Sequence, residues 1–292
     1  MRIREAAAAD RDAILALRMR CFGEVDREKN DQRFWEWEFR DARCFVGQEE
    51  NALTTHLAFV RTPYVVDGAI VEGGMAVDAM TAPEARGKGA FTQVVQASRD
   101  AFPLSTAYQI RRPVLGAMLR GGWSIAAKAW VLVRPLILAP RASDRVRLLT
   151  RDETPLMARI AASMPGARVA RTPEWLAWRF FDNPHWSYRV TALDDRAYLV
   201  ARRTSLKDFD TFAIADLAFT DRDAARELIR DAVAEGKRLG CTLAAALASP
   251  SHPAFWLLVR RGFIPSHHRF RLLVHPQRKL TWRVMWADTD HL

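Results

Sequence analysis

Cysteines and long apolar runs are scarce in this chain. Only Cys21, Cys44 and Cys241 occur among 292 residues, far apart and without a CxxC or a Cys/His pair at metal-ligand spacing. The scarcity excludes a disulfide framework, and we predict no metal site. No run of about 18 uncharged apolar residues occurs, and the first residues lack the apolar stretch of a signal peptide. We therefore expect a cytoplasmic protein without a membrane partner.

Lysine is also rare, because it supplies only 6 of the 44 basic residues. The formal net charge is nevertheless +10, and the arginines are scattered rather than gathered in one block. Such a charge attracts polyanions, for example phosphorylated cofactors, nucleotide sugars or RNA, without selecting among them. A general arginine bias explains the scatter better than a dedicated nucleic-acid surface does. With 49% hydrophobic residues the chain is typical of a globular protein.

The chain repeats itself once, with an offset of roughly 141 residues. The segment 34–41 (FWEWEFRD) matches 175–182 (WLAWRFFD) at four positions. Further matches are the openings Ala8-Ala9-Asp10 and Thr150-Arg151-Asp152, the strand segments 77–80 and 215–218, and the pairs Gly122-Trp123 and Gly262-Phe263. Two copies of one α/β unit are the economical interpretation.

Helix and strand signals alternate within each copy. Asp10 precedes apolar residues at helical spacing, and Thr150 with Glu153, like Thr220 with Asp223, resembles a capping box. These patterns predict helices that start near residues 11, 151, 173 and 221. Residues 242–248 are typical of a short buried strand.

The segment from 75 to 97 combines a strand-like stretch, a glycine turn and a helical stretch. The turn is Pro83-Glu84-Ala85-Arg86-Gly87-Lys88-Gly89-Ala90. Glycines let successive backbone N–H groups point into one concavity, and the positive end of the following helix adds to them. The order predicts an anion site suited to a pyrophosphate. Neither GxxxxGK[ST] nor GxGxxG is present, so the common nucleotide motifs do not apply.

This order resembles the GNAT superfamily of acyl-CoA-dependent N-acyltransferases, whose cofactor loop is commonly P-x-x-R-G-x-G. Residues 83–89 supply that pattern, and residues 117–123 (AMLRGGW) are similar to the family's later helix, which ends in Gly-Phe or Gly-Trp. The resemblance covers most of both halves. It implies two tandem GNAT-like units, each a mixed, mostly antiparallel central sheet flanked by helices. A GNAT domain with the cofactor loop spans 1–140, and a degenerate GNAT-like domain without glycines at the loop spans 141–292.

The resemblance implies acetyl-CoA, or another acyl-CoA, as the cofactor. The strand backbone at Met80 and Thr81 would align the pantetheine arm. The backbone of the loop and of the first helical turn would hold the pyrophosphate, which implies the set Arg86, Gly87, Lys88, Gly89, Ala90 and Phe91. The side chains of Arg86 and Lys88 would add positive charge.

Acyl transfer to an amine needs a general base within hydrogen-bond reach of the amine or one water away. Asp78 and Glu72 on the expected central strand are the candidates. Asp216 stands at the counterpart of Asp78 in the half without a loop, which favours a structural role for Asp78.

The general acid is the second catalytic group. Many GNAT enzymes use a tyrosine shortly before the terminal Gly-Phe, but Met118 stands at that place here, and Leu258 stands at its counterpart. Tyr108, on the preceding strand-like segment, is our substitute candidate.

The resemblance therefore implies an acyl-CoA-dependent N-acyltransferase, with acetyl-CoA as the first choice, acting on a small-molecule amine such as an amino sugar, an amino acid or an antibiotic. A Fem-type aminoacyl-tRNA-dependent transferase is one alternative, because it shares two GNAT-like units and would use the positive charge for tRNA. Under this alternative, residues 86–89 would have no pyrophosphate to bind. A non-catalytic acyl-CoA-binding module is the other alternative, which Met118 and Leu258 keep open. Outside the tRNA alternative we expect no nucleic-acid partner.

Overall fold

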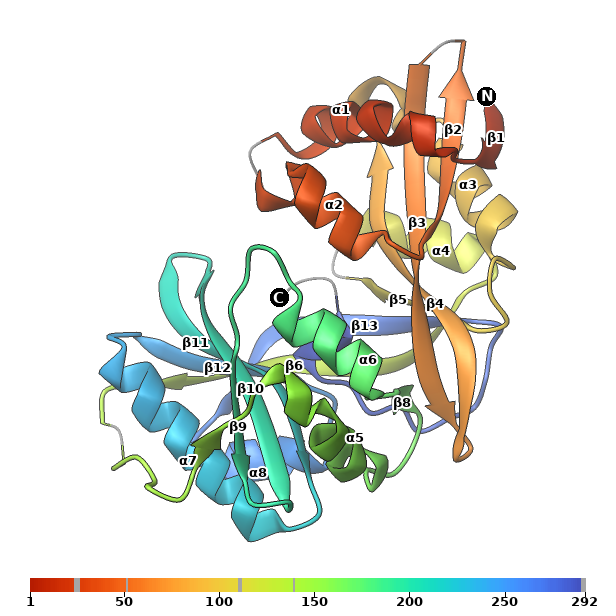
Figure 1. Cartoon of the computed structure of the whole chain (residues 1–292). Coiled ribbons are helices and arrows are strands. Elements are labelled where there is room, and N and C mark those ends of the chain that lie inside the picture. Colours follow the sequence, from red (N-terminus) through yellow and green to blue (C-terminus); the bar gives the residue numbers. More distant parts are fainter. Residues whose placement is uncertain (24–26, 51, 110–111, 139, 290–292) are drawn as a thin grey trace. The chain divides into compact units, whose positions relative to one another are not determined.

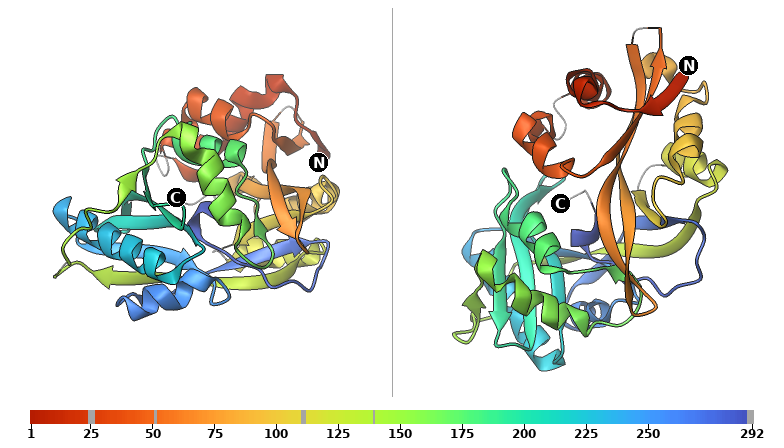
Figure 2. Two further views of the ribbon diagram at one scale, coloured as in Figure 1. Left: turned by 60° about the horizontal axis from the view of Figure 1, so that its bottom comes forward. Right: turned by 45° about the vertical axis from the view of Figure 1, so that its right-hand side comes forward.

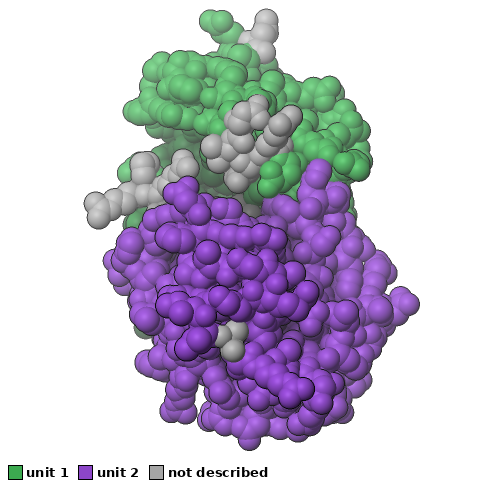
Figure 3. All heavy atoms as spheres, turned by 90° about the vertical axis from the view of Figure 1, so that its left-hand side faces the viewer, with its two compact units in different colours: residues 1–64, 70–126, 271–279 green, residues 65–69, 127–270, 280–292 purple. Residues whose placement is uncertain are grey.

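The computed structural model describes residues 1–23, 27–50, 52–109, 112–138 and 140–289 (Figure 1). The chain forms two compact units, which Figure 3 colours separately. Unit 1 comprises residues 1–64, 70–126 and 271–279, and unit 2 comprises residues 65–69, 127–270 and 280–292.

Unit 1 is a mixed sheet with helices on both faces. Its strands follow the order β1-β2-β3-β4-β5-β13, in which β4 and β5 are parallel and β13 is antiparallel to β5. Its elements are β1 (Arg2–Glu5), α1 (Arg11–Phe22), α2 (Gln32–Glu38), β2 (Arg43–Glu49), β3 (Ala52–Val66), β4 (Ala69–Thr81), α3 (Ala90–Ser98), β5 (Ser105–Gln109), α4 (Arg112–Arg120) and the end of β13 (Ile264–His275).

Two apolar clusters hold the helices of unit 1 to its sheet. Ile14 and Leu17 of α1 pack with Met80 of β4, whereas Val94 of α3 packs with Phe59 of β3. Accordingly, α1 and α2 lie on one side of the strands and α3 and α4 on the other (Figure 2). The buried apolar side chains of each helix face the sheet, and their burial holds the helix in place.

Unit 2 repeats this plan. Its strands follow the order β6-β12-β11-β10-β9-β7, with β11 and β12 parallel. Its elements are β6 (Ser124–Pro135), β7 (Arg147–Leu148), α5 (Thr154–Ala162), β8 (Arg168–Val169), α6 (Pro173–Leu176), β9 (Arg189–Leu193), β10 (Ala197–Leu206), β11 (Phe209–Phe219), α7 (Arg222–Arg238), β12 (Leu243–Ala248) and α8 (Pro253–Arg260). The predicted fold class, two α/β units with mixed, mostly antiparallel sheets, is confirmed.

The compact units differ from the predicted halves 1–140 and 141–292. Residues 127–140 group with unit 2, because β6 pairs with β12 from Trp130 to Pro135. Residues 271–279 group with unit 1, because Arg271–His275 of β13 pairs with β5. Each sheet is therefore completed by a strand from the other half of the sequence.

Most of the predicted element starts are confirmed. Helix α1 begins directly after Asp10, and the Thr150–Glu153 capping box forms, with the Thr150 N–H donating to Oε2 of Glu153 at 2.9 Å. The second predicted capping box is wrong, because Asp221 rather than Thr220 is the N-cap of α7. Within the described residues, no helix combines the length and apolarity that a membrane span needs.

Candidate active site

The predicted anion loop joins β4 to α3 in unit 1. A 3₁₀ turn at Pro83–Ala85 follows β4, and α3 begins at Ala90 with Gly89 as its N-cap. Gly87 and Gly89 have φ angles of +77° and +82°. A Cβ atom at either glycine would meet no atom within 4 Å, so backbone conformation and not crowding favours glycine there.

The start of α3 is open for an anion. No side chain caps this helix, and the first N–H groups of any helix have no intrahelical acceptor. The positive end of the helix dipole points the same way. Ala90 and Met80 are buried and Phe91 packs partly against the core, so these three residues can offer a ligand mainly their backbone.

Charged side chains surround the loop without closing it. Arg86 donates from Nε to the carbonyl oxygen of Thr81 at 3.1 Å, which ties the loop back to the end of β4. Arg20 of α1 forms an exposed ion pair with Glu84. Lys88 is exposed and forms no ion pair with any described residue. The loop thus retains positive charge that faces solvent.

Asp78 does not present a free carboxylate. Its side chain is only 5% exposed, and Oδ1 accepts a hydrogen bond from Arg18 of α1. The imidazole of His56 on β3 contacts the backbone carbonyl of Asp78 at 2.9 Å. A carboxylate held by an arginine under a helix is unsuited to take a proton from an amine, so the geometry favours a structural role for Asp78.

Glu72 lies away from the loop. It is six residues before Asp78 on the same strand, or about 20 Å at the usual rise of a strand. Its carboxylate is half exposed and pairs with Arg61 at 2.8 Å. The structure does not bring Glu72 together with the other predicted site residues.

Tyr108 lies where β4 and β5 part. The last residue pair between the two strands is Ala76 with Ala107, so Tyr108 and Asp78 both follow the end of the pairing. Ala107 packs in the core cluster with α3 and α4, and adjacent strand residues face opposite sides. The half-buried side chain of Tyr108 therefore lies on the side of α1 and α2, as does that of Asp78.

Met118 stands at the position where many GNAT enzymes have the tyrosine that acts as general acid, and its side chain is buried. It is 1% exposed within the core cluster of α4, and Leu258 of α8 is fully buried. Neither position can donate a proton.

One cavity of unit 1 is lined by residues of α1, α2 and β2. It has a volume of about 390 Å³ and is lined in part by Ile14, Trp35, Phe39 and Cys44. None of the predicted site residues lines it. The site is therefore defined by the loop and not by this cavity.

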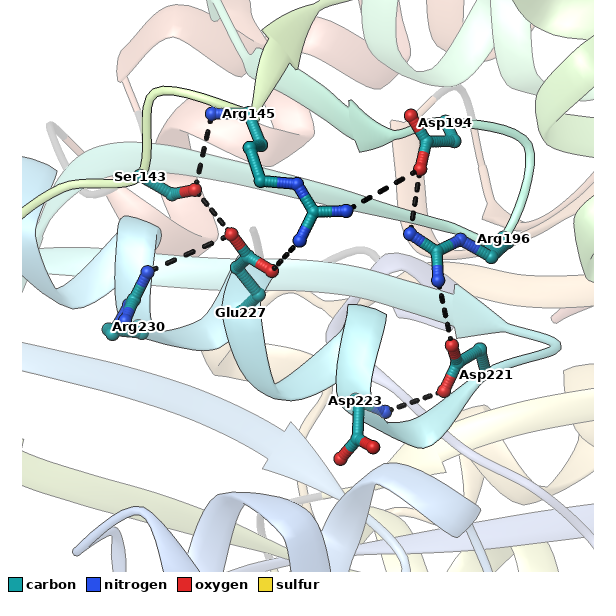
Figure 4. Close-up of polar contacts among 8 residues, drawn as sticks. All are labelled: Ser143, Arg145, Asp194, Arg196, Asp221, Asp223, Glu227 and Arg230. Carbon is teal, nitrogen blue, oxygen red and sulfur yellow. Dashed lines mark hydrogen bonds and ion pairs between the residues drawn. The ribbon is translucent and has the colours of Figure 1, made fainter.

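Unit 2 has no counterpart of the glycine loop. Only Thr220 and Asp221 separate β11 from α7, and Oδ1 of Asp221 accepts from the N–H of Asp223 at 2.8 Å. Arg196 donates to Asp221 at 3.0 Å, and Glu227 accepts from Ser143 and Arg145 (Figure 4). A carboxylate thus stands where α3 of unit 1 offers unoccupied backbone, and a second anion would be repelled.

Sequence reasoning missed Arg18 and His56. Arg18 appeared as one of several arginines on an amphipathic helix, and His56 as one polar residue in a strand. Both are buried beside Asp78. No local sequence pattern predicts their roles, because these depend on which helix packs against which strand.

Comparison with known proteins agrees with this geometry. Residues 2–102, which include β4, the loop and α3, match the family model described as an acetyltransferase (GNAT) domain. This part of the chain is similar to GNAT acetyltransferase domains. No curated protein sequence matches the chain. The match supports an acyltransferase enzyme, as the sequence resemblance predicted.

Solved structures share the fold over nearly the whole chain. A GCN5-related N-acetyltransferase from Anabaena variabilis has a TM-score of 0.71 and 16% identity, with 94% of this chain and 72% of that one covered. A probable N-acyltransferase from Enterococcus faecalis has a TM-score of 0.69 and 11% identity, with 94% and 71% covered. The N-myristoyltransferase of Saccharomyces cerevisiae, solved with bound myristoyl-CoA, has a TM-score of 0.62 and 13% identity, with 94% and 78% covered. At these identities the likeness shows the fold alone, and it extends beyond residues 2–102 into unit 2.

Proposed function

We propose that this protein transfers an acyl group, acetyl as the first choice, from an acyl-CoA to the amino group of a small molecule, and that the GNAT domain carries the site. The observation that carries the proposal is the open glycine loop ahead of an uncapped helix, within the residues that match the family. The loop fits a pyrophosphate because its two left-handed glycines and the first turn of α3 offer backbone donors beside Arg86 and Lys88.

The chain's own residues would act by positioning and by proton transfer. Bound acyl-CoA supplies the thioester whose carbonyl carbon the amine attacks. The backbone of Met80 and Thr81 would align the donor, and residues 86–91 would hold its pyrophosphate. Tyr108 would donate the proton that the departing thiolate needs, because it lies where β4 and β5 part. The amine would then lose its proton to water or to a group of the acceptor, because Asp78 is held by Arg18.

Titration calorimetry tests the proposal directly. We expect saturable binding of acetyl-CoA and CoA to the whole protein, and thiol release when acetyl-CoA meets the right amine in a panel of amino sugars, amino acids and aminoglycosides. Myristoyl-CoA belongs in the same titration, because a structural relative was solved with that ligand. Absence of binding at millimolar ligand would overturn the proposal and bring forward tRNA, whose binding would fall steeply with salt.

A non-catalytic acyl-CoA-binding module is the second candidate function. Two observations favour it: the carboxylate of Asp78 is buried and paired, and Met118 occupies the family's usual acid position. Tight CoA binding without thiol release on any amine would support it.

Tyr108→Phe separates the two functions. If Tyr108 is the general acid, we expect turnover on an identified acceptor to fall about 100-fold, the lower end for loss of a general acid or base. The Kd for CoA should stay within a factor of about three, because the hydroxyl makes no part of the loop. Full turnover by the variant would rule out Tyr108 as the acid.

A further inference from the structure

Strand β4 is bulged at Asp78, just before the loop. Asp78 has a φ of +52°, in the left-handed region that strand residues avoid. Ala76 and Ala79 lie three residues apart, yet both pack against the core cluster of α3 and α4. The alternation of side chains is therefore broken between them. The bulge falls where β4 leaves β5 and three residues before Thr81, which binds Arg86 of the loop.

Two buried side chains hold this bulge. His56 is fully buried, and its Nδ1 lies 2.9 Å from the carbonyl oxygen of Asp78. A carbonyl oxygen only accepts, so Nδ1 carries the hydrogen and donates it. Arg18 fixes the carboxylate of the same residue. Burial lowers the pKa of His56 and outweighs the opposite effect of the Asp78 charge, so the imidazole is neutral and the donor at Nδ1 persists at physiological pH.

Unit 2 has an aspartate at the place of Asp78 but no glycine loop, so the two units can be compared at this position. Asp216, the counterpart of Asp78, is held by Arg171 with two contacts of 2.9 Å. Tyr198 stands on β10 where His56 stands on β3, but its hydroxyl donates to the carboxylate of Asp216 at 2.8 Å and not to the backbone. Strand β11 also has a register shift against β10, between Ile214 and Asp216, but Asp216 does not have a positive φ. The fold thus keeps the buried arginine–aspartate pair in both units, whereas only the unit with the glycine loop holds a left-handed aspartate by its carbonyl.

We propose that His56, with Arg18, is a positioning residue for the acyl-donor site: it holds the Asp78 carbonyl and keeps the backbone of β4 from Asp78 to Thr81 in its bulged form. This inference rests on the proposed function of the loop. A left-handed non-glycine residue persists only when its surroundings impose it. Without the hydrogen bond from His56, β4 relaxes from its bulged form in part of the molecules. The apparent affinity for acyl-CoA then falls in proportion to the fraction of molecules that remain bulged.

A set of substitutions at His56 tests the proposal by CoA binding in the absence of any acceptor. His56→Leu removes the donor while filling much of the same space, and we expect CoA affinity to fall on the order of tenfold. His56→Asn places an amide N–H where Nδ1 was, and we expect affinity within about threefold of the wild type although the smaller side chain leaves a cavity. Tyr198→Phe is the matched control, because it removes one buried hydrogen bond to the counterpart aspartate in unit 2.

The outcomes are separable from those of the proposed function. If the wild type does not bind CoA, the function fails. If the wild type binds and His56→Leu binds equally well, only the positioning role is refuted. Equal loss in His56→Leu, His56→Asn and Tyr198→Phe would also refute it, because that result would mean general destabilisation, which thermal unfolding of each variant measures. If His56→Leu does not fold, His56→Gln takes its place, since its amide nitrogen lies at the level of Nε2 and leaves the carbonyl of Asp78 without a donor.

Discussion

The Gly89→Asp variant should bind CoA about 100-fold more weakly than the wild type, which corresponds to ~2.8 kcal/mol. Gly89 has a φ of +82°, so any side chain there is strained, by about 1–3 kcal/mol. Aspartate also places a negative charge at the start of α3, where the proposed pyrophosphate would lie. The two effects act in the same direction, and calorimetric titration of both proteins with CoA measures their sum.

Two further variants divide this effect. Gly89→Ala keeps the backbone strain without the charge, so we expect a loss of about tenfold. Gly68→Asp introduces the same residue at a φ of +84° in the turn between β3 and β4, where a Cβ atom also meets no atom within 4 Å. This control should leave CoA affinity unchanged. An unaltered affinity in Gly89→Asp would show that the loop does not bind the pyrophosphate.

Replacing Arg171 with methionine should lower the free energy of unfolding by about 3–5 kcal/mol, as expected when a buried ion pair loses one partner. The Arg171 side chain is 7% exposed, contacts Asp216 twice at 2.9 Å and contacts Asp288 at 2.5 Å. Without the guanidinium, two buried carboxylates lose their counter-charge. Urea unfolding of both proteins at pH 7 provides the measurement.

Arg203→Met is the matched control in the same sheet. Arg203 of β10 also pairs with an aspartate, Asp210, but its side chain is 56% exposed. Exposed ion pairs are screened by water and contribute little to stability, so this variant should unfold close to the wild type. An Arg171→Met protein within about 1 kcal/mol of the wild type would mean that the buried cluster adds little to stability.

The pH dependence gives the Arg171 prediction a second test. Burial raises the pKa of Asp216, but the charge of Arg171 and the hydrogen bonds from Arg171 and Tyr198 outweigh it and hold this pKa below its ordinary value. In the wild type this stabilisation is present above the ordinary pKa and is lost as pH falls through the lowered one. In Arg171→Met the charge and hydrogen bonds of Arg171 are lost, so burial is opposed mainly by the hydrogen bond from Tyr198 and the pKa of Asp216 rises. The stability difference between the two proteins should therefore narrow as pH falls from neutral toward 5.

Local signals in the sequence located most helices and the loop. Asp10 accepts from the N–H of Ala7, and Glu153 accepts from the N–H of Thr150, so both signals act within a few residues wherever the helix packs. The two glycines after β4 have the left-handed angles that the turn needs. The resemblance to the GNAT superfamily rested on these same local features, and it could be read from one sequence for that reason.

Strand partners were not available to the same reasoning. Strand β6 follows α4 in the chain, yet β13 is the strand that pairs with β5, and β6 pairs with β12. A strand carries a pattern of alternating faces but no code for its neighbour. The boundary between units could not be derived from the order of residues alone.

What the sequence determined by itself is the repeat, the alternation of helices and strands, and a glycine loop in only one of two similar units, because each depends on residues close together in the chain. Tertiary structure alone decided the environment of Asp78. From the sequence alone, Asp78 was a candidate general base on a central strand. Burial against α1 and β3 placed Arg18 on its carboxylate and His56 on its carbonyl. Those contacts join residues 22 and 60 positions apart, and such pairings arise only when packing brings the elements together.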